Sequence, residues 1–310
     1  PVAQPVAALL SSVLSALSAH HSSSMSNPPP TLRQSRVLRL LTTPVARYGK
    51  AGGVVEDGAL FAFVEGTDPE VFLFLEVREG ELLCIVGPSG CGKSTLLNLM
   101  AGLDRPTTGE IWMDGRQVVG PGTDRIVIFH ELGLFPWLTV RENVEFGLRM
   151  QGVSTAERRA CSQDYLRLVH LSRFEASYIH QLSGGMKQRV ALARSLVTKP
   201  AVLLMDEPFA ALDAQTRDLL HDELERIWAE TGKTIVFVTH NVREAVRLGG
   251  RVIVLSFRPG RIKSQFSIAL PRPRHLEDPQ LALTAREVLT QLKEEINKAV
   301  EEEFSHEENH

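Results

Sequence analysis

The chain of 310 residues is 43% hydrophobic, and its length suits one α/β core of about 230 residues with an extension at each end. The formal net charge of −3 argues against non-specific nucleic-acid binding. No run reaches the roughly 18 apolar residues of a membrane-spanning helix, so any membrane role must come through a partner. The cysteines, Cys84, Cys91 and Cys161, have no metal-ligand spacing and fit a reducing compartment.

The start of the chain is rich in Ala, Ser, Val and Pro, and no acidic residue precedes Glu56. The apolar stretch Ala7–Leu17 resembles the core of an export signal, but no positive charge precedes it. The acid-poor, Ser-rich composition also suits an organelle transit segment. We expect residues 1–35 to be a disordered extension. Alternatively, the true start is Met25 and residues 1–24 do not belong to the native protein.

A glycine-rich loop is the first segment that carries chemistry. Its glycines and its Lys-Ser pair fit the phosphate-binding pattern Gly-x-x-x-x-Gly-Lys-Ser/Thr, between a predicted buried strand at 82–86 and a predicted helix at 94–101. Lys93 would reach the β- and γ-phosphates, and the Ser94 hydroxyl would ligate Mg²⁺. The alternative is a strand-to-helix turn without a ligand. The predicted nucleotide contacts are Gly87, Pro88, Ser89, Gly90, Cys91, Gly92, Lys93, Ser94 and Thr95.

Two adjacent carboxylates follow a second apolar strand. The run 202–205 predicts that strand, and Asp206 and Glu207 stand at its carboxyl end, where open α/β sheets bind ligands. Asp206 would hold Mg²⁺ directly or through water, and Glu207 would accept a proton from the attacking water. Taken alone, such a pair is often only a solvated loop or a helix cap. Its combination with a phosphate loop favours the catalytic interpretation.

Residues 181–189, between these two segments, read Gln-Leu-Ser-Gly-Gly-Met-Lys-Gln-Arg. Ser183 is typical of a helix N-cap, and the two glycines after it would let an anion approach the helix start. On local evidence alone this is an ordinary capped helix. Its buried face would consist of Val190, Leu192, Ala193 and Leu196.

In this order the three segments resemble those of the nucleotide-binding subunits of ATP-binding cassette (ABC) transporters. Residues 182–189 resemble that family's signature motif, 211–213 its D-loop, and 236–240 the strand that ends in the switch histidine. The resemblance covers roughly residues 36–265. It implies an α/β fold, a P-loop NTPase core of the ABC type with an antiparallel β subdomain and a helical subdomain at about 131–190. The phosphate loop and the segments 134–144 and 239–245 most resemble importers of the nitrate, sulfonate and taurine group.

The resemblance implies a homodimer in which each ATP lies between the phosphate loop of one subunit and the signature residues of the other. Those signature residues are Ser183, Gly184, Gly185 and Gln188. It assigns proton acceptance to Glu207, contact with the γ-phosphate to His240, and the D-loop position to Asp213. It implies transmembrane permease subunits as direct partners and a periplasmic or extracellular solute-binding protein as an indirect one. The chain would lie on the cytoplasmic side of the inner (plasma) membrane as a peripheral protein.

Two positions depart from the family pattern. After the strand predicted at 126–129 the family normally carries a glutamine, and this chain has His130. An imidazole can ligate a metal but can also become charged near neutral pH. We therefore expect His130 to join Ser94 and Asp206 at Mg²⁺, with binding kept and hydrolysis or coupling weakened. Gly250 replaces a usual acidic residue, which removes a partner for a polar group and loosens the approach to the strand at 251–255.

Tyr48 resembles the aromatic residue on which the adenine base stacks in the family. The stretch between it and the phosphate loop is longer than usual, and the segments 52–58 and 66–69 suggest turns that hold the extra length. The alternative is a tyrosine of the core or of the surface.

Three further regions are predicted to be helical. In the helical subdomain, Phe135, Trp137 and Phe146 could form a groove for a permease helix, although aromatic residues at such spacing more often belong to a core. A helix at 213–230, capped by Asp213, would bury Leu219, Leu220, Leu224, Ile227 and Trp228. Residues 266–310 form a C-terminal extension with an acidic end. Its amphipathic helix at 284–304 would either pack on the core or serve a partner, and packing on the core is the default expectation; its apolar stripe consists of Val288, Leu289, Leu292, Ile296 and Val300.

We therefore predict an ATP-hydrolysing subunit of an ABC importer for nitrate, sulfonate, taurine or a similar small solute, with ATP and Mg²⁺ as cofactors. One alternative is a weakly hydrolysing regulatory subunit, motivated by His130 and Gly250. Another is an ABC ATPase without transport, which typically carries two cassettes or a long coiled-coil insertion, and neither occurs here. The chain does not specify the solute, because the membrane and binding-protein partners select it.

Overall fold

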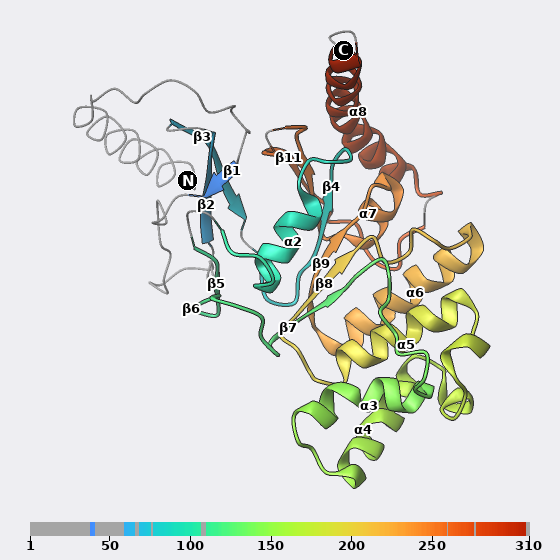
Figure 1. Cartoon of the computed structure of the whole chain (residues 1–310). Coiled ribbons are helices and arrows are strands. Elements are labelled where there is room, and N and C mark those ends of the chain that lie inside the picture. The colour runs from blue at the N-terminus through green and yellow to red at the C-terminus, as the bar shows by residue number, and fades with distance from the viewer. Residues whose placement is uncertain are drawn as a thin grey trace, which may run out of the picture.

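The computed structural model describes residues 38–40, 59–65, 68–75, 77–106, 110–258, 260–275 and 277–307. A six-stranded sheet with the order β11-β10-β4-β9-β8-β7 forms the centre of this part of the chain (Figure 1). The predicted extension at 1–35, Tyr48 and the predicted turn at 52–58 lie outside the described residues.

Five strands of the central sheet are parallel. They are β4 (Leu82–Val86), β7 (Arg125–Ile128), β8 (Val202–Asp206), β9 (Thr234–Val238) and β10 (Arg251–Leu255), and β11 (Ile262–Ser267) pairs antiparallel with β10. Every residue of β4, β9 and β10 is buried, as expected for parallel strands with both faces covered. β7 forms the border of the sheet and ends at Ile128, and the next residue, Phe129, is exposed.

Helices cover both faces of this sheet. Leu83 and Ile85 of β4 belong to the buried cluster around α2 (Lys93–Ala101). Leu82, Cys84 and Val86, which alternate with them, belong to the opposite cluster. That second cluster contains side chains of α5 (Gly184–Leu196), α6 (Ala214–Thr231), α7 (Val242–Leu248) and α8 (Pro279–Glu307). The alternation explains why the strand is apolar throughout: each face has its own helical layer.

Two smaller sheets lie beside the α2 layer. β1 (Leu38–Leu40), β2 (Ala59–Glu65) and β3 (Asp68–Leu75) are antiparallel, which agrees with the expected antiparallel β subdomain. β5 (Trp112–Met113) and β6 (Arg116–Gln117) form a hairpin. Its turn residues Asp114 and Gly115 have φ values of 49° and 71°, the type I′ conformation that suits a two-residue hairpin turn.

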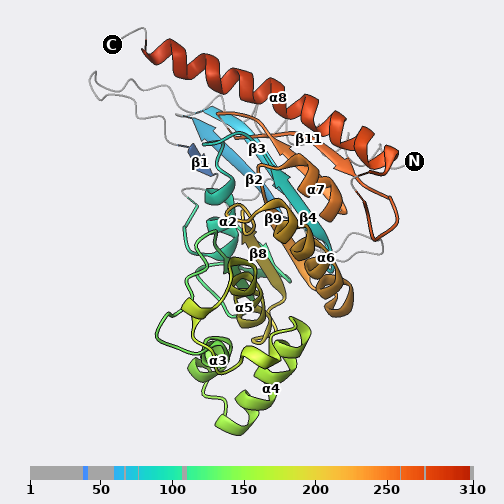
Figure 2. The ribbon, with the colours of Figure 1, turned by 90° about the vertical axis from the view of Figure 1, so that its right-hand side faces the viewer.

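The region after β7 is helical. α3 (Val140–Met150) and α4 (Thr155–Leu168) each begin with a capping box, and the 3₁₀ turns Ser172–Phe174 and Ile179–Gln181 lead into α5. Figures 1 and 2 show α3 and α4 together at the end of the molecule far from α8. The helix α5 joins this region to the sheet, because it contacts both α3 and β7.

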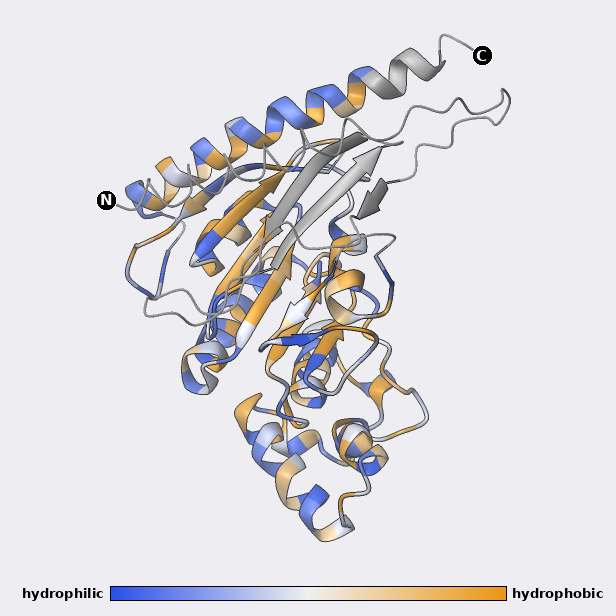
Figure 3. Cartoon of the chain, turned by 90° about the vertical axis from the view of Figure 1, so that its left-hand side faces the viewer, coloured by the Kyte–Doolittle hydropathy of each residue, from blue (hydrophilic) through white to orange (hydrophobic). Residues whose placement is uncertain are grey.

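The C-terminal helix α8 is longer than predicted and lies along β11 and α7 (Figure 2). Its apolar stripe is only partly buried: Val288 and Leu292 enter the core, whereas Leu289, Ile296 and Val300 are 39–42% exposed. Polar and apolar residues alternate along its length in Figure 3. The default expectation of packing on the core therefore holds for Val288 and Leu292 and does not hold for the other three residues of the stripe. None of the described helices is both long and apolar enough to cross a membrane.

Two more predictions from sequence need correction. Leu219 is 62% exposed, because the buried face of α6 is centred on Leu220, Leu224 and Ile227. Gly250 does not loosen the approach to β10. Its N–H donates to Leu82 O at 2.8 Å and its carbonyl accepts the Ile268 N–H at 2.8 Å, which fixes both sides of the residue.

Candidate nucleotide-binding site

The phosphate loop connects β4 to α2. Gly90 and Gly92 have φ values of 74° and 96°, a left-handed conformation that glycine adopts without strain. Gly87 is needed for another reason, because a Cβ there would lie 2.6 Å from Cys91 Sγ and 3.2 Å from Leu255 Cβ. Burial raises the pKa of the Cys91 thiol, so this side chain fills space as a neutral group. The glycines of the pattern therefore serve both the bend of the loop and its close packing.

Lys93 is the first residue of α2, and its side chain folds back over the loop. The Nζ atom donates to Gly87 O at 3.0 Å and to Pro88 O at 2.9 Å, and the residue is only 8% exposed. Ser94 and Thr95 lie exposed in the first turn of the same helix, and no side chain caps it. The first N–H groups of α2 and the Lys93 ammonium thus concentrate positive charge where an anion can approach.

The strand register brings the predicted acidic and histidine residues to the same edge of the sheet as this loop. Ile85 of β4 pairs with Val238 of β9, and Val238 also pairs with Asp206 of β8. The carboxyl ends of β4, β8 and β9 therefore lie side by side; Glu207 follows β8 directly, and His240 is the second residue after β9. Glu207 has a φ of 46°, which is uncommon for a residue with a side chain and marks a strained position.

Glu207 and His240 are in direct contact. The Glu207 carboxylate Oε2 and the His240 Nδ1 atom are 2.8 Å apart, with 29% and 64% of the two side chains exposed. Because an ionised carboxylate only accepts hydrogen bonds, this contact requires Nδ1 to be the donor. The Glu207 N–H donates to Val238 O at 2.9 Å, so the backbone of the pair is also fixed. Such a pair can bind water and accept a proton from it.

A buried polar network lies behind His240. The Thr239 hydroxyl donates to Glu244 Oε2, and Glu244 Oε1 lies 2.7 Å from His221 Nε2. Arg247 then pairs with Asp218 and Asp222 at 3.0 and 2.6 Å. The sequence analysis missed this network. In the sequence, the only sign of this network is a set of polar residues on α6 and α7. That these residues are buried and meet one another becomes apparent only when the two helices are packed together.

The signature segment forms the N-terminus of α5. Ser183 is its exposed N-cap and accepts the Met186 N–H at 3.4 Å, as predicted. Gly184 is exposed, whereas Gly185 is buried so closely that a Cβ would lie 2.7 Å from Thr216 Cγ2. Gln188 does not lie on the exposed surface. It is 4% exposed and its amide donates to Pro208 O, which connects α5 to the loop that holds Glu207.

Asp213 is occupied within its own subunit. Its carboxylate accepts the Thr216 N–H at 2.9 Å and caps α6, as the sequence predicted. That backbone hydrogen bond lowers the pKa of Asp213 below its usual value. The D-loop aspartate is therefore a helix cap that stands exposed beside the signature helix.

The three predicted metal ligands come from different strand ends. Asp206 is half-buried at the end of β8, whereas Ser94 and His130 are exposed after β4 and β7. Among the described residues, no three His, Cys, Asp or Glu side chains are grouped as a metal site. One carboxylate and one hydroxyl suit Mg²⁺ at phosphate sites, where substrate oxygens and water supply most ligands.

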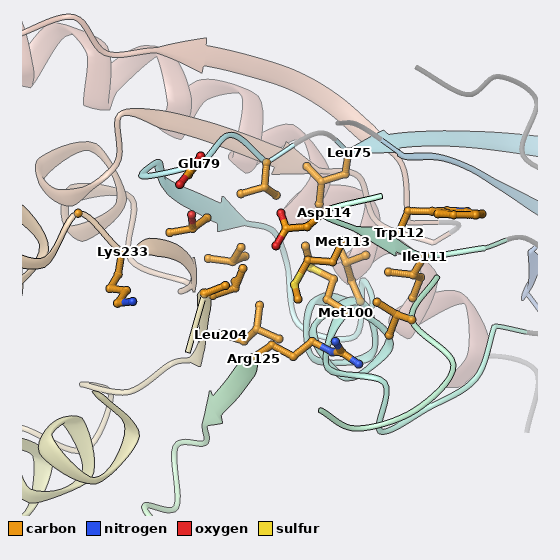
Figure 4. Close-up of a pocket in the computed structure, with 18 of the residues that line it drawn as sticks. Leu75, Glu79, Met100, Ile111, Trp112, Met113, Asp114, Arg125, Leu204 and Lys233 are labelled. Carbon is orange, nitrogen blue, oxygen red and sulfur yellow. The ribbon is translucent and has the colours of Figure 1, made fainter. Parts of the chain in front are cut away.

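A cavity of about 640 Å³ lies elsewhere, at the opposite end of the strands (Figure 4). Val202 and Thr234, the first residues of β8 and β9, line it together with Leu96 and Met100 of α2 and Trp112 of the hairpin. Its walls combine apolar side chains with charged ones such as Glu79, Arg125 and Lys233, and none of the predicted nucleotide contacts lines it. This cavity is therefore separate from the edge of the sheet that holds the phosphate loop, Glu207 and His240, which we call the nucleotide edge.

A glycine-rich phosphate loop after a central parallel strand, with a carboxylate pair after another, defines the P-loop nucleotide-binding ATPases. The comparison with known proteins narrows the class. The family described as ABC transporter matches residues 73–210. An uncharacterized ABC transporter ATP-binding protein of Methanocaldococcus jannaschii is 51% identical over 226 residues, which are 73% of this chain and 85% of that protein.

Two relatives carry more specific names. A nitrate import ATP-binding protein of Synechocystis is 54% identical over 64% of this chain and 74% of its own length. A taurine import ATP-binding protein of Burkholderia pseudomallei is 51% identical over 64% of this chain and 76% of its own length. A solved dimeric bacterial ABC transporter cassette is 32% identical, with a TM-score of 0.57 over 76% of this chain and 100% of that one. The chain belongs to the ABC transporter family of ATP-binding proteins, and it is an ATPase of that family.

Proposed function

We propose that the chain is the ATP-hydrolysing subunit of an importer for a small solute such as nitrate, a sulfonate or taurine. The observation that carries the proposal is the 2.8 Å contact between Glu207 and His240 at the strand edge that also holds the phosphate loop. The relatives named for nitrate and taurine import support the choice of solute class. A weakly hydrolysing regulatory subunit is not favoured, because this pair is intact.

In this proposal, the phosphate-loop N–H groups and Lys93 bind the phosphates of ATP. Bound Mg²⁺, held by Ser94, Asp206 and His130, would neutralise developing phosphate charge. Glu207 accepts the proton of the attacking water, and its carboxylate stays oriented by the hydrogen bond from His240 Nδ1. The strained φ of Glu207 and its N–H bond to Val238 O keep that carboxylate at the end of β8.

The nucleotide site is completed by a second copy of the chain. Ser183 and Gly184 are exposed at the N-terminus of α5 and make no contact with the phosphate loop of their own subunit in the described contacts. Backbone N–H groups at a helix start suit a γ-phosphate presented by a partner subunit. ATP then favours the closed homodimer, because it binds both halves only in that state.

An aromatic cluster in the helical region, with Trp137 exposed and Phe135 and Phe146 half-buried, forms the contact with the permease. The Phe135 ring lies 5.6 Å from Trp137 and 4.5 Å from Phe146, measured between centroids, and Trp137 is 70% exposed. Arg194 lies over Phe135 at 5.9 Å and keeps the cluster in place. The chain is thereby a peripheral protein on the cytoplasmic face of the inner (plasma) membrane. A periplasmic or extracellular solute-binding protein would act through the permease.

Transport in membrane vesicles tests the proposal. The chain would be reconstituted with a permease and a solute-binding protein encoded beside it, with ATP inside the vesicles and the binding protein and labelled nitrate, taurine or an alkanesulfonate outside. ATP-dependent uptake of one of these solutes supports the proposal, and Glu207→Gln should abolish that uptake. Uptake of none of them, with intact ATP hydrolysis, would contradict the solute class. An absence of ATP hydrolysis in the wild type would contradict the function itself.

A further inference from the structure

The loop between β10 and β11 packs against the outside of the phosphate loop. β10 is the parallel neighbour of β4, with Val254 opposite Val86, so the two loops leave the sheet at the same edge. The β10–β11 loop is closed on itself, because the Ser256 N–H donates to Arg261 O at 2.8 Å. This hydrogen bond closes the base of the loop.

Two contacts join this loop to the tip of the phosphate loop. Arg258 Nε donates to Gly90 O at 3.4 Å, and a Cβ on Gly90 would lie 3.2 Å from Arg258 Nη2. A Cβ on Gly260 would lie only 2.3 Å from the carbonyl oxygen of Cys91. With the contact of Gly87 against Leu255, the phosphate loop is thus supported by β10 and its loop at three points along its backbone.

The C-terminal helix holds the same loop from the other side. Glu295 of α8 is 1% exposed, and its carboxylate accepts the Phe257 N–H at 2.9 Å. The carboxylate also receives Lys263 of β11 at 2.9 Å and Lys298 at 2.7 Å. Burial alone would raise the pKa of Glu295, but the hydrogen bonds from Lys298, Lys263 and Phe257 outweigh burial and bring it to about 2. The buried group is therefore ionised and held by three donors.

These contacts form one continuous path: Glu295 binds Phe257, and the next residues of that loop contact Gly90 and Cys91. The backbone N–H groups of the phosphate loop bind phosphate only when they point inward, and such sites tolerate displacements of about 0.5 Å. The β10–β11 loop supports the phosphate loop. A residue that fixes the β10–β11 loop therefore affects how well the phosphate loop binds a triphosphate.

We propose that Glu295 is a positioning residue for the phosphate loop, and that α8 sets the affinity for ATP through the β10–β11 loop. The proposal rests on the proposed ATP-binding function of the same site. It gives the C-terminal helix a role in nucleotide binding, although α8 itself contributes none of the predicted nucleotide contacts.

Two substitutions with matched controls test it in the full chain, by titration with a fluorescent ATP analogue and by ATPase kinetics. Gly260→Ala pushes a methyl group toward Cys91 O, whereas Gly250→Ala, directly before β10, meets nothing closer than 3.8 Å. Glu295→Gln removes the buried charge, whereas Glu294→Gln changes an exposed neighbour that pairs with the same Lys263. We expect Gly260→Ala and Glu295→Gln to weaken ATP binding on the order of fivefold, and both controls to stay within about twofold.

The kinetic pattern separates positioning from a loss of folded protein. Weaker loop positioning raises KM for ATP with little change in kcat, because the lost interaction is made equally in the ground and transition states. A lower apparent kcat with unchanged KM would mean that α8 only stabilises the fold, and would overturn the proposal. Binding within twofold of the wild type for both Gly260→Ala and Glu295→Gln would overturn it as well. If the wild type itself bound no ATP, the proposed function would fail first.

Discussion

At the nucleotide edge of the sheet, the residues that follow the middle strands β8 and β9 are held by more contacts than the residue that follows the border strand β7. In the middle, Glu207 is bonded to His240 and to Val238 O, and Thr239 is bonded to the buried Glu244. At the border, His130 follows β7 in an exposed position, and none of the described side chains forms a hydrogen bond or an ion pair with its ring. Glu207 and His240 are thus held by contacts within the chain, whereas none of the described side chains holds the His130 ring.

The largest effect is expected at the pair in the middle. Glu207→Gln should lower ATPase turnover by about 10²- to 10⁴-fold, because the amide cannot accept a proton from water. ATP binding should persist, so a stable dimer should accumulate with ATP, as measured by phosphate release and size-exclusion chromatography. Glu277→Gln changes an exposed carboxylate far along the chain and serves as the control. Wild-type ATPase turnover in Glu207→Gln would contradict the role of Glu207 as proton acceptor, and with it the chemical difference between the middle and the border of the nucleotide edge.

The network behind His240 should show the next largest effect. Glu244→Ala leaves the Thr239 hydroxyl and the His221 ring without their acceptor in a buried place, which should cost about 1–3 kcal/mol of unfolding free energy. Urea denaturation measures this loss, and turnover should fall with it because the loop of His240 loosens. Glu287→Ala, the same change at an exposed site of α8, should be nearly neutral. Equal losses for both variants would show that the network does not stabilise the middle region.

Glu295, which joins α8 to the β10–β11 loop, is expected to have a smaller effect on stability, and this effect depends on pH. The pKa of Glu295 is about 2 in the folded chain, below its ordinary value, so its contribution to stability is complete above the unfolded pKa of about 4.5. This contribution decreases as the pH falls from about 4.5 toward 2. Urea denaturation should therefore show wild type more stable than Glu295→Gln at pH 6, with a narrower gap at pH 3. A gap that stays constant with pH would contradict the ionised, hydrogen-bonded state of Glu295.

The smallest effect is expected at the border strand. His130→Gln should change stability by no more than about 0.5 kcal/mol, because the side chain is exposed. If the imidazole weakens hydrolysis or coupling as predicted, turnover in this variant should rise on the order of threefold, since an amide oxygen orients water without gaining a charge. ATPase and vesicle transport measure the two effects. Equal rates and equal transport for both proteins would end this interpretation of His130.

The sequence by itself determined the features that depend on short spacing. The phosphate loop, the carboxylates after β8, and the caps at Ser183 and Asp213 each follow from a few consecutive residues, because turns and helix starts are local structures. The buried helix face with Val190, Leu192, Ala193 and Leu196 was also predicted, since helical periodicity shows in one segment.

Only the tertiary structure decided which faces are covered and which distant residues meet. Gln188 belongs to the segment predicted to contact a partner's ATP but is buried against Pro208, and Leu219 belongs to a predicted buried face but is exposed. Glu295 lies about two hundred residues after the phosphate loop and reaches it through Phe257. Such contacts depend on how helices and strands pack in three dimensions, and no local pattern of residues encodes that packing.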